Sequence, residues 1–251
     1  MIFRYFDFNF FWYIMLISAV TQSSLVDYPG KVACIVFTVW CNFRCWFCHN
    51  PECVIPEKIK QIKNDLIPEN IFFNFLKSRI WFLDWVSICG GEPTLHSDLY
   101  DFVKKIKNLW FLVKLDTNWS NANIIEKLMG DNLVDYVAVD LKNPLDDYSN
   151  LVWIQIKKDF LESYEKILKL LLNSNIDYEY RSTLIKWFHN EEKIEKMSKY
   201  ISWAKNYYLQ NYKSWNTLKS DFDGRSFTNQ ELIDFQKIAS KYVKNCQIRS
   251  W

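Results

Sequence analysis

Three cysteines, Cys41, Cys45 and Cys48, lie within eight residues of one another. That density does not fit an ordinary disulfide framework. Thiolates are the ligands that hold iron–sulfur clusters, and three on one short loop can bind a [4Fe-4S] cluster while leaving its fourth iron without a protein ligand. The alternative is a structural zinc site, which takes four ligands. Its fourth ligand would be one of three nearby side chains: Cys53, Cys34 or His49.

A second group with chemical potential follows the next apolar run, as Gly90, Gly91, Glu92 and Pro93. Two glycines allow a close approach of the backbone to a ligand, and a carboxylate suits an ammonium group. By itself such a sequence is more often a plain turn. Its position one strand after the cysteine loop makes the two signals specific together.

Short apolar runs alternate with amphipathic stretches along most of the chain. The expected strands cover residues 31–38, 85–89, 111–115, 136–141, 178–185 and 207–210. The expected helices cover residues 68–79, 97–107, 121–129, 160–172, 191–205 and 229–244. About six repeats of strand and crossover predict an α/β fold, a parallel sheet with outer helices in an open or closed barrel. The polar motifs follow strand carboxyl ends, where ligands collect in such sheets.

Composition excludes several classes of protein. The chain has 251 residues and a formal net charge of +2, so no overall basic field points to nucleic acid. The apolar stretch 8–20 is shorter than the roughly 20 residues that span a bilayer, and no signal-peptide cleavage site follows it. We therefore expect a cytoplasmic protein without a nucleic-acid or membrane partner. We divide it into a lead-in (1–21), a core domain (22–215) and a C-terminal helical segment of the same domain (216–251). Residues 1–14 are not native if translation starts at Met15.

The two motifs together resemble the radical S-adenosylmethionine (radical SAM) superfamily. Its members carry three cysteines with the spacing C-x3-C-x2-C after the first strand, which Cys41, Cys45 and Cys48 match. A Gly-Gly-Glu-Pro motif after the second strand binds the methionine amino group of SAM, and residues 90–93 match it. The resemblance implies a partial (β/α)6 barrel with parallel strands and outer helices, a [4Fe-4S] cluster and bound SAM.

Four further segments, 24–30, 48–51, 114–118 and 139–142, resemble the activating enzymes of glycyl-radical enzymes, above all the type that serves anaerobic ribonucleoside-triphosphate reductase. The resemblance implies that a flavodoxin or ferredoxin reduces the cluster. SAM is then cleaved to a 5′-deoxyadenosyl radical, which takes a hydrogen atom from a glycine of the partner. It also implies a SAM pocket lined by five polar residues: Asp116, Asn118, Asp140, Lys142 and, on the fifth predicted strand, Arg181.

Two other functions remain open from the sequence. The partner could be pyruvate formate-lyase or another glycyl-radical enzyme, or the chain could be a zinc-binding module without catalysis. The cysteines outside the motif, Cys34, Cys89 and Cys246, are expected to be small buried side chains. His189 matches no motif and is expected in a surface loop.

The glycine and tryptophan counts are abnormal. The chain has 5 Gly and 12 Trp, whereas a typical protein of this length carries roughly 18 glycines. Trp40, Trp119 and Trp187 stand where the family characteristically has glycine, and Trp85, Trp110 and Trp215 lie where a turn or strand-edge glycine would be natural. One mechanism explains both counts: the source organism reads the UGA codon as glycine, and the gene was translated with UGA as tryptophan. The alternative is a genuinely tryptophan-rich variant with a crowded pocket.

Overall fold

The computed structural model describes residues 15–27, 31–219 and 222–249. Residues 1–14, on which the alternative start at Met15 depends, lie outside this range. Eight strands form one sheet in sequence order. Their bounds are β1 Ile17–Ser24, β2 Ala33–Thr38, β3 Trp85–Gly90, β4 Leu112–Thr117, β5 Tyr136–Asp140, β6 Asp177–Leu184, β7 Tyr207–Asn211 and β8 Cys246–Arg249. β1 pairs antiparallel with β2, and every later pair is parallel.

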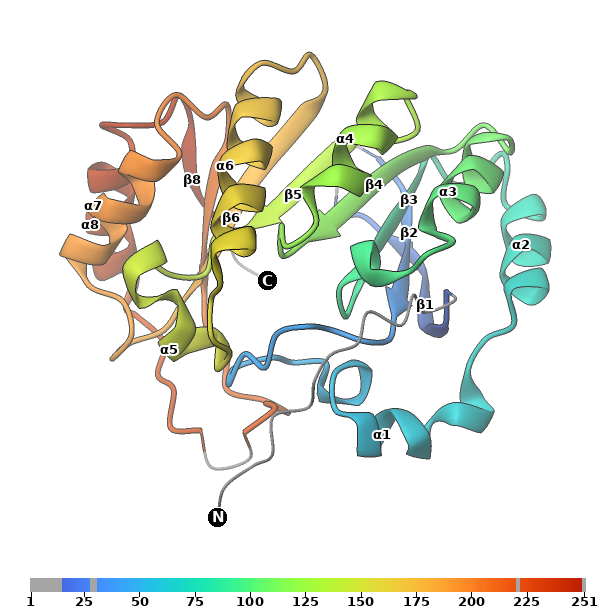
Figure 1. Ribbon diagram of the computed structural model, residues 1–251, viewed down its shortest axis with the longest axis horizontal. Coiled ribbons are helices and arrows are strands. Elements are labelled where there is room, and N and C mark those ends of the chain that lie inside the picture. Colours follow the sequence, from blue (N-terminus) through green and yellow to red (C-terminus); the bar gives the residue numbers. More distant parts are fainter. Residues whose placement is uncertain (1–14, 28–30, 220–221, 250–251) are drawn as a thin grey trace.

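Helices connect the parallel strands. They are α1 Pro56–Gln61, α2 Glu69–Lys77, α3 Leu99–Lys107, α4 Ala122–Gly130, α5 Tyr148–Val152, α6 Lys158–Leu172, α7 Glu191–Tyr200 and α8 Asn229–Ala239. Figure 1 shows α2, α3, α4, α6 and the α7–α8 pair following one another in an arc along one side of the sheet. The segment that runs from the end of β2 to α1 (blue to cyan) lies at the bottom of this view, away from the arc.

Amphipathic patterning explains why these segments form these elements. In α3, Leu99, Phe102, Val103 and Ile106 are buried at helical spacing, while its lysines face outward. The central strands are buried along most of their length, as expected for a parallel sheet covered by helices. The resulting apolar core fixes the sheet, and the loops at the strand carboxyl ends are left to carry the polar motifs.

The expected α/β partial barrel is confirmed, with a strand added at each edge. β1 was not expected because it is an edge strand, half-exposed and rich in small polar residues, which gives little apolar periodicity. The helix expected over residues 229–244 ends at Ala239, and the chain then forms the short strand β8 within the segment 216–251. Strand pairing that short is decided by the neighbouring strand β7.

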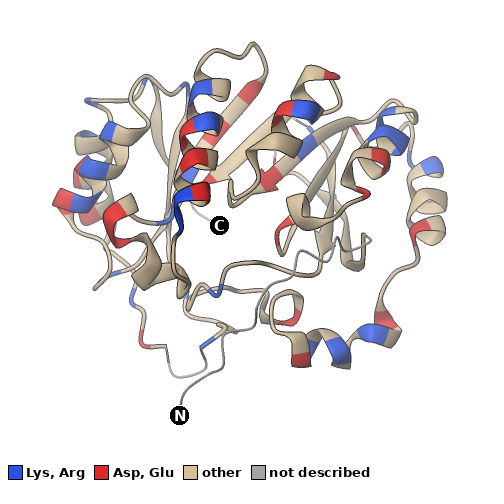
Figure 2. Ribbon diagram, in the orientation of Figure 1, with Lys and Arg blue, Asp and Glu red and all other residues tan. Residues whose placement is uncertain are grey.

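Positively and negatively charged residues are mixed along the helices. Figure 2 shows Lys and Arg interspersed with Asp and Glu along the helices of the arc. In the described ranges, no helix combines the length and the apolar character that crossing a membrane would need.

Candidate active site

The cysteine loop leaves the carboxyl end of β2. Cys45 is buried, and Cys41 and Cys48 are partly covered. Two contacts shape the loop: the Cys48 amide donates to the Cys45 carbonyl (3.0 Å), and the Phe43 amide lies 3.4 Å from Cys41 Sγ. Burial raises the pKa of Cys45 to about 12, and it raises the pKa of Cys41 and Cys48 as well. Thiols in this environment need a bound cation to become thiolates.

Segments distant in sequence hold the loop in place. The Arg44 guanidinium donates to the Cys41 carbonyl (2.6 Å), while the Arg44 amide donates to the carbonyl of Val152, the last residue of α5 (2.9 Å). From the C-terminal region, the Leu218 amide donates to the Cys48 carbonyl (3.0 Å). The motif residues are therefore positioned by tertiary contacts that the sequence pattern did not indicate.

Gly90 is the last residue of β3, next to the end of β2, and Gly91 begins the loop that follows. Gly90 has φ +104°, and a Cβ there would lie 2.4 Å from the Thr38 nitrogen. A Cβ on Gly91 would lie 2.0 Å from the Trp40 carbonyl oxygen. The Gly91 amide donates to the Thr38 carbonyl (2.7 Å), and the Glu92 amide donates to the Trp40 carbonyl (2.7 Å). Both glycines are thus required by close backbone packing against the entrance of the cysteine loop.

Glu92 is fully buried at the junction of two loops. Its Oε1 accepts hydrogen bonds from the Thr94 hydroxyl (2.5 Å) and from the Thr117 hydroxyl (2.8 Å). Its Oε2 accepts from the Asn118 amide (2.6 Å), and Asn118 Nδ2 in turn donates to Asn42 Oδ1 (2.7 Å). The β2, β3 and β4 loops are therefore connected through Glu92 and Asn118. In this structure the Glu92 carboxylate acts on its own chain, with protein donors on both oxygens. Pro93, buried beside it, begins a single 3-10 turn.

Three neighbouring strands place charged side chains together. Arg181 on β6 donates through Nη1 to Asp116 on β4 (2.7 Å) and through Nε to Asp140 on β5 (2.5 Å). Lys142 Nζ contacts the other Asp140 oxygen at 2.9 Å, and Lys114 Nζ lies 3.3 Å from Asp116. The strand register explains the grouping, because Asp140 pairs directly with Arg181. The structure therefore brings together the four charged residues of the expected SAM pocket, and it supplies Lys114, which was not expected.

The electrostatics favour the ionised forms of Asp140 and Lys142. Burial alone would raise the pKa of Asp140, but Arg181 and Lys142 lower it to well below its usual range. Burial alone would lower the pKa of Lys142, but Asp140 and Cys45 raise it. An ion-pair network of this kind presents fixed charges to whatever ligand the adjacent loops hold.

The chemistry of the donors bears on which metal group the cysteines fit. A closed zinc site needs four ligands on one ion, whereas a [4Fe-4S] cluster distributes its thiolates over separate irons. Two of the three side chains considered as a fourth zinc ligand have other contacts: His49 Nε2 lies 2.8 Å from the Lys213 carbonyl, and Cys53 lies 3.2 Å from Ser18. The donor set fits the cluster.

One expectation about a single residue was wrong, and another was confirmed only in part. His189 is buried, not in an exposed loop, with Nε2 2.9 Å from the Lys142 carbonyl and Nδ1 accepting from the Ile185 amide (3.0 Å). It therefore supports the loop that carries Lys142. A lone histidine without a motif gives no sequence signal of such a role.

The cysteines outside the motif lie mostly in the interior: Cys34 and Cys246 are buried as expected, but Cys89 is only partly buried.

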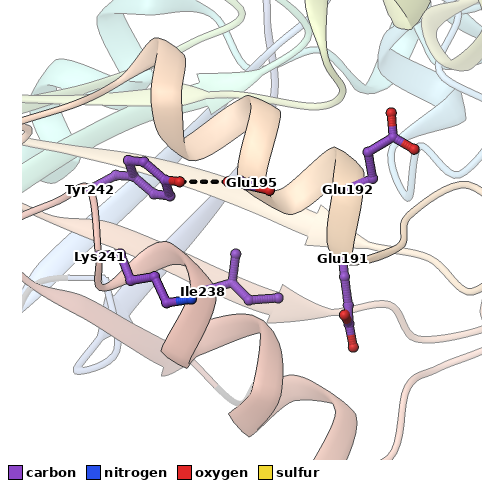
Figure 3. A pocket seen from close by; sticks show the side chains of 6 residues that line it. All are labelled: Glu191, Glu192, Glu195, Ile238, Lys241 and Tyr242. Carbon is purple, nitrogen blue, oxygen red and sulfur yellow. Dashed lines mark hydrogen bonds between the residues drawn. The ribbon is translucent and has the colours of Figure 1, made fainter.

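A separate surface hollow lies between α7 and α8. Figure 3 shows Glu191, Glu192 and Glu195 on one side and Ile238, Lys241 and Tyr242 on the other, with the Tyr242 hydroxyl donating to Glu195 (2.6 Å). No residue of the cysteine loop or of the expected SAM pocket lines this hollow. It is not part of the candidate active site.

Comparison with known proteins decides the family. The model of the radical SAM superfamily matches residues 35–204, which include the cysteine loop and strands β3 to β6. The chain belongs to the radical SAM superfamily.

Radical SAM enzymes use a [4Fe-4S] cluster and SAM, and this chain has relatives of that kind over nearly its whole length. It is 32% identical to MJ1227 of Methanocaldococcus jannaschii, whose name places it among glycyl-radical enzyme activating enzymes, over 94% of this chain and 96% of that one. It is 24% identical to the pyruvate formate-lyase-activating enzyme of Clostridium pasteurianum, over 91% and 96% of the two chains. A radical SAM methyltransferase from Sphaerobacter thermophilus shares the fold with a TM-score of 0.69 and 13% identity, over 89% of this chain and 67% of that one. The chain is a radical SAM enzyme of the glycyl-radical enzyme activating family.

Proposed function

We propose that this chain is a cytoplasmic activase that generates a glycyl radical on anaerobic ribonucleoside-triphosphate reductase. The observation that carries the proposal is the joining of the cysteine loop, the Gly-Gly-Glu loop and the β4 loop at Glu92 and Asn118. All seven cysteines are free thiols, which agrees with a reducing compartment. The choice of the reductase rests on the resemblance of segments 24–30, 48–51, 114–118 and 139–142.

In this proposal Cys41, Cys45 and Cys48 hold the cluster, and the loop of Gly90 and Gly91 borders the methionine end of SAM. When bound, the cluster supplies the electron that cleaves SAM reductively, with a flavodoxin or ferredoxin as its source. The chain itself binds and orients. Its loops fix the positions of the two cofactors and keep water out.

The charged residues of β4, β5 and β6 orient the rest of SAM. Asp116, Asp140, Lys142 and Arg181 are already paired with one another, so their positions are set before SAM binds. A preorganised pocket avoids the cost of ordering side chains on binding. Asn118 is assigned to the same pocket by the resemblance of segment 114–118.

Activation of pyruvate formate-lyase is the second candidate. It is favoured by the pyruvate formate-lyase-activating enzyme of Clostridium pasteurianum, whose similarity extends over 91% of this chain. The same site chemistry serves both partners, so only the partner distinguishes them.

The test uses anaerobically prepared protein with iron, sulfide and SAM restored. It is mixed with a reductant and with either purified anaerobic reductase or purified pyruvate formate-lyase from the same organism. A glycyl-radical electron-spin signal on the reductase alone supports the proposal, and a signal on the lyase alone replaces it with the second candidate. Stoichiometric zinc without iron uptake or SAM cleavage would instead indicate the zinc-binding module.

A further inference from the structure

The backbone places tryptophan in a conformation that side chains rarely adopt. Eight non-glycine residues in the described ranges have positive φ, and two of them are asparagines, which tolerate it. The other six are all tryptophans: Trp40 (69°), Trp110 (68°), Trp119 (60°), Trp153 (50°), Trp187 (89°) and Trp203 (71°). Only a few per cent of non-glycine residues have positive φ. Among the ten tryptophans in the described ranges, at most about one would therefore be expected to have it.

The local structure at these positions is the kind that selects glycine. Trp153 is the left-handed cap that ends α5, with φ 50° and ψ 40°. Trp110 follows α3 and closes a turn through its amide on the Lys107 carbonyl (2.9 Å). Helices commonly end on a left-handed glycine. Trp187 occupies the turn after β6, and Trp203 the turn after α7.

The indoles themselves gain little from their surroundings. Trp110, Trp153, Trp187 and Trp203 are exposed by 58–89%, although tryptophan is highly buried on average. Trp119 is the opposite case. It is fully buried, and its ring centroid lies 3.8 Å from that of Tyr164, closer than the roughly 4.5–7 Å usual for aromatic pairs.

We propose that positions 40, 110, 119, 153, 187 and 203 are glycine in the protein as its source organism makes it, because the gene uses UGA for glycine. Composition supports the same idea: 5 Gly and 12 Trp together come close to the roughly 18 glycines expected for this length. The backbone adds Trp153 and Trp203 to the positions that the sequence suggested. It gives no such reason for Trp85, which lies within β3, or for Trp215.

Two of the six positions adjoin the candidate active site. Position 40 precedes Cys41, and its carbonyl accepts the Glu92 amide (2.7 Å). Position 119 follows Asn118, and its amide donates to the Thr117 hydroxyl (3.0 Å). These two contacts use the backbone only, which glycine supplies equally well, although the Trp119 indole also donates a hydrogen bond to the Tyr148 hydroxyl (3.1 Å). The inference does not depend on which enzyme is activated.

The direct test reads the gene and the native protein. The codons for the six positions should all be UGA, and mass spectrometry of peptides from the source organism should show glycine at each of them. A UGG codon, or a native peptide carrying tryptophan, at any of the six positions would overturn the proposal there and remove the common mechanism.

A matched pair of variants tests the physical argument in protein made with tryptophan. Trp110 and Trp81 are almost equally exposed, at 89% and 91%, but only Trp110 has positive φ. Trp110→Gly should raise the Tm by roughly 2–4 °C because it relieves backbone strain, whereas Trp81→Gly should not raise it. Equal shifts for the two variants would contradict the strain argument. The variant with glycine at all six positions should also take up more iron and more SAM than the parent.

Discussion

Glu92 Oε2 accepts a hydrogen bond from the backbone amide of Asn118 at 2.6 Å, with both residues buried. Glu92 follows β3, and Asn118 follows β4, so a single contact fixes two adjacent loops. Asn118 extends the connection to Asn42 in the cysteine loop (2.7 Å). Any change at this contact should therefore reach both proposed cofactor sites.

The first prediction follows from that contact. In Glu92→Ala the Asn118 amide loses its acceptor, and the β4 loop is no longer held against the β3 loop. Losing a hydrogen bond to a charged group costs about 1.5–3 kcal/mol, so the dissociation constant for SAM should rise about ten- to a hundredfold. Isothermal titration under anaerobic conditions measures it. Glu69→Ala on the surface of α2 is the control, and an unchanged SAM affinity in Glu92→Ala would refute the placement.

The second prediction concerns the cluster ligands. Cys41→Ala, Cys45→Ala and Cys48→Ala should each abolish cluster binding and SAM cleavage, because each removes one of only three thiolates. Iron analysis and absorption spectra of reconstituted protein check this, with about four irons per chain in the parent. Cys53→Ala is the matched control, since Cys53 is buried against Ser18 and lies outside the motif. Full iron loading in any of the three variants would exclude the assignment.

The third prediction concerns the ion pairs of Arg181. Arg181→Leu leaves Asp116 and Asp140 without their shared partner, and removing one side of a buried pair costs up to about 3–5 kcal/mol. Urea unfolding of the apoprotein should show this loss. Arg225→Leu is the control, because its side chain is 62% exposed and its ion pair with Asp223 is long, at 3.6 Å. That change should stay within about 0.5 kcal/mol. Similar losses in the two variants would mean that the Arg181 pairs contribute nothing specific.

The fourth prediction is a pH dependence from His189. Burial lowers the pKa of His189 to about 4, and Nδ1 of the neutral ring accepts the Ile185 amide (3.0 Å). The unfolded chain takes up the proton near pH 6.5. The folded state therefore binds fewer protons between pH 6.5 and 4, and stability falls as the pH drops through this window, by at most about 3 kcal/mol.

Urea unfolding at several pH values measures this effect. His189→Gln keeps a donor for the Lys142 carbonyl but does not titrate, so its stability should change less over the same window. Parallel curves for the parent and the variant would show that His189 is not the source of the pH dependence.

The sequence by itself determined the chemistry and the fold class. The spacing of Cys41, Cys45 and Cys48 and the Gly-Gly-Glu-Pro sequence are local features, because ligand spacing and tight turns are encoded within a few residues. The alternation of strands and helices was equally readable, since each element buries one face at its own period. The excess of tryptophan over glycine was also visible in composition alone.

Only the tertiary structure decided how these parts meet. Three sets of contacts join residues far apart in the chain. The β4 loop hydrogen-bonds to Glu92, Arg181 bridges Asp116 and Asp140, and the buried His189 contacts the Lys142 carbonyl. No local pattern specifies such contacts, because they depend on strand register and on which side chains share one end of the sheet. The backbone angles that single out six tryptophans are likewise set by the turns that the folded chain must make.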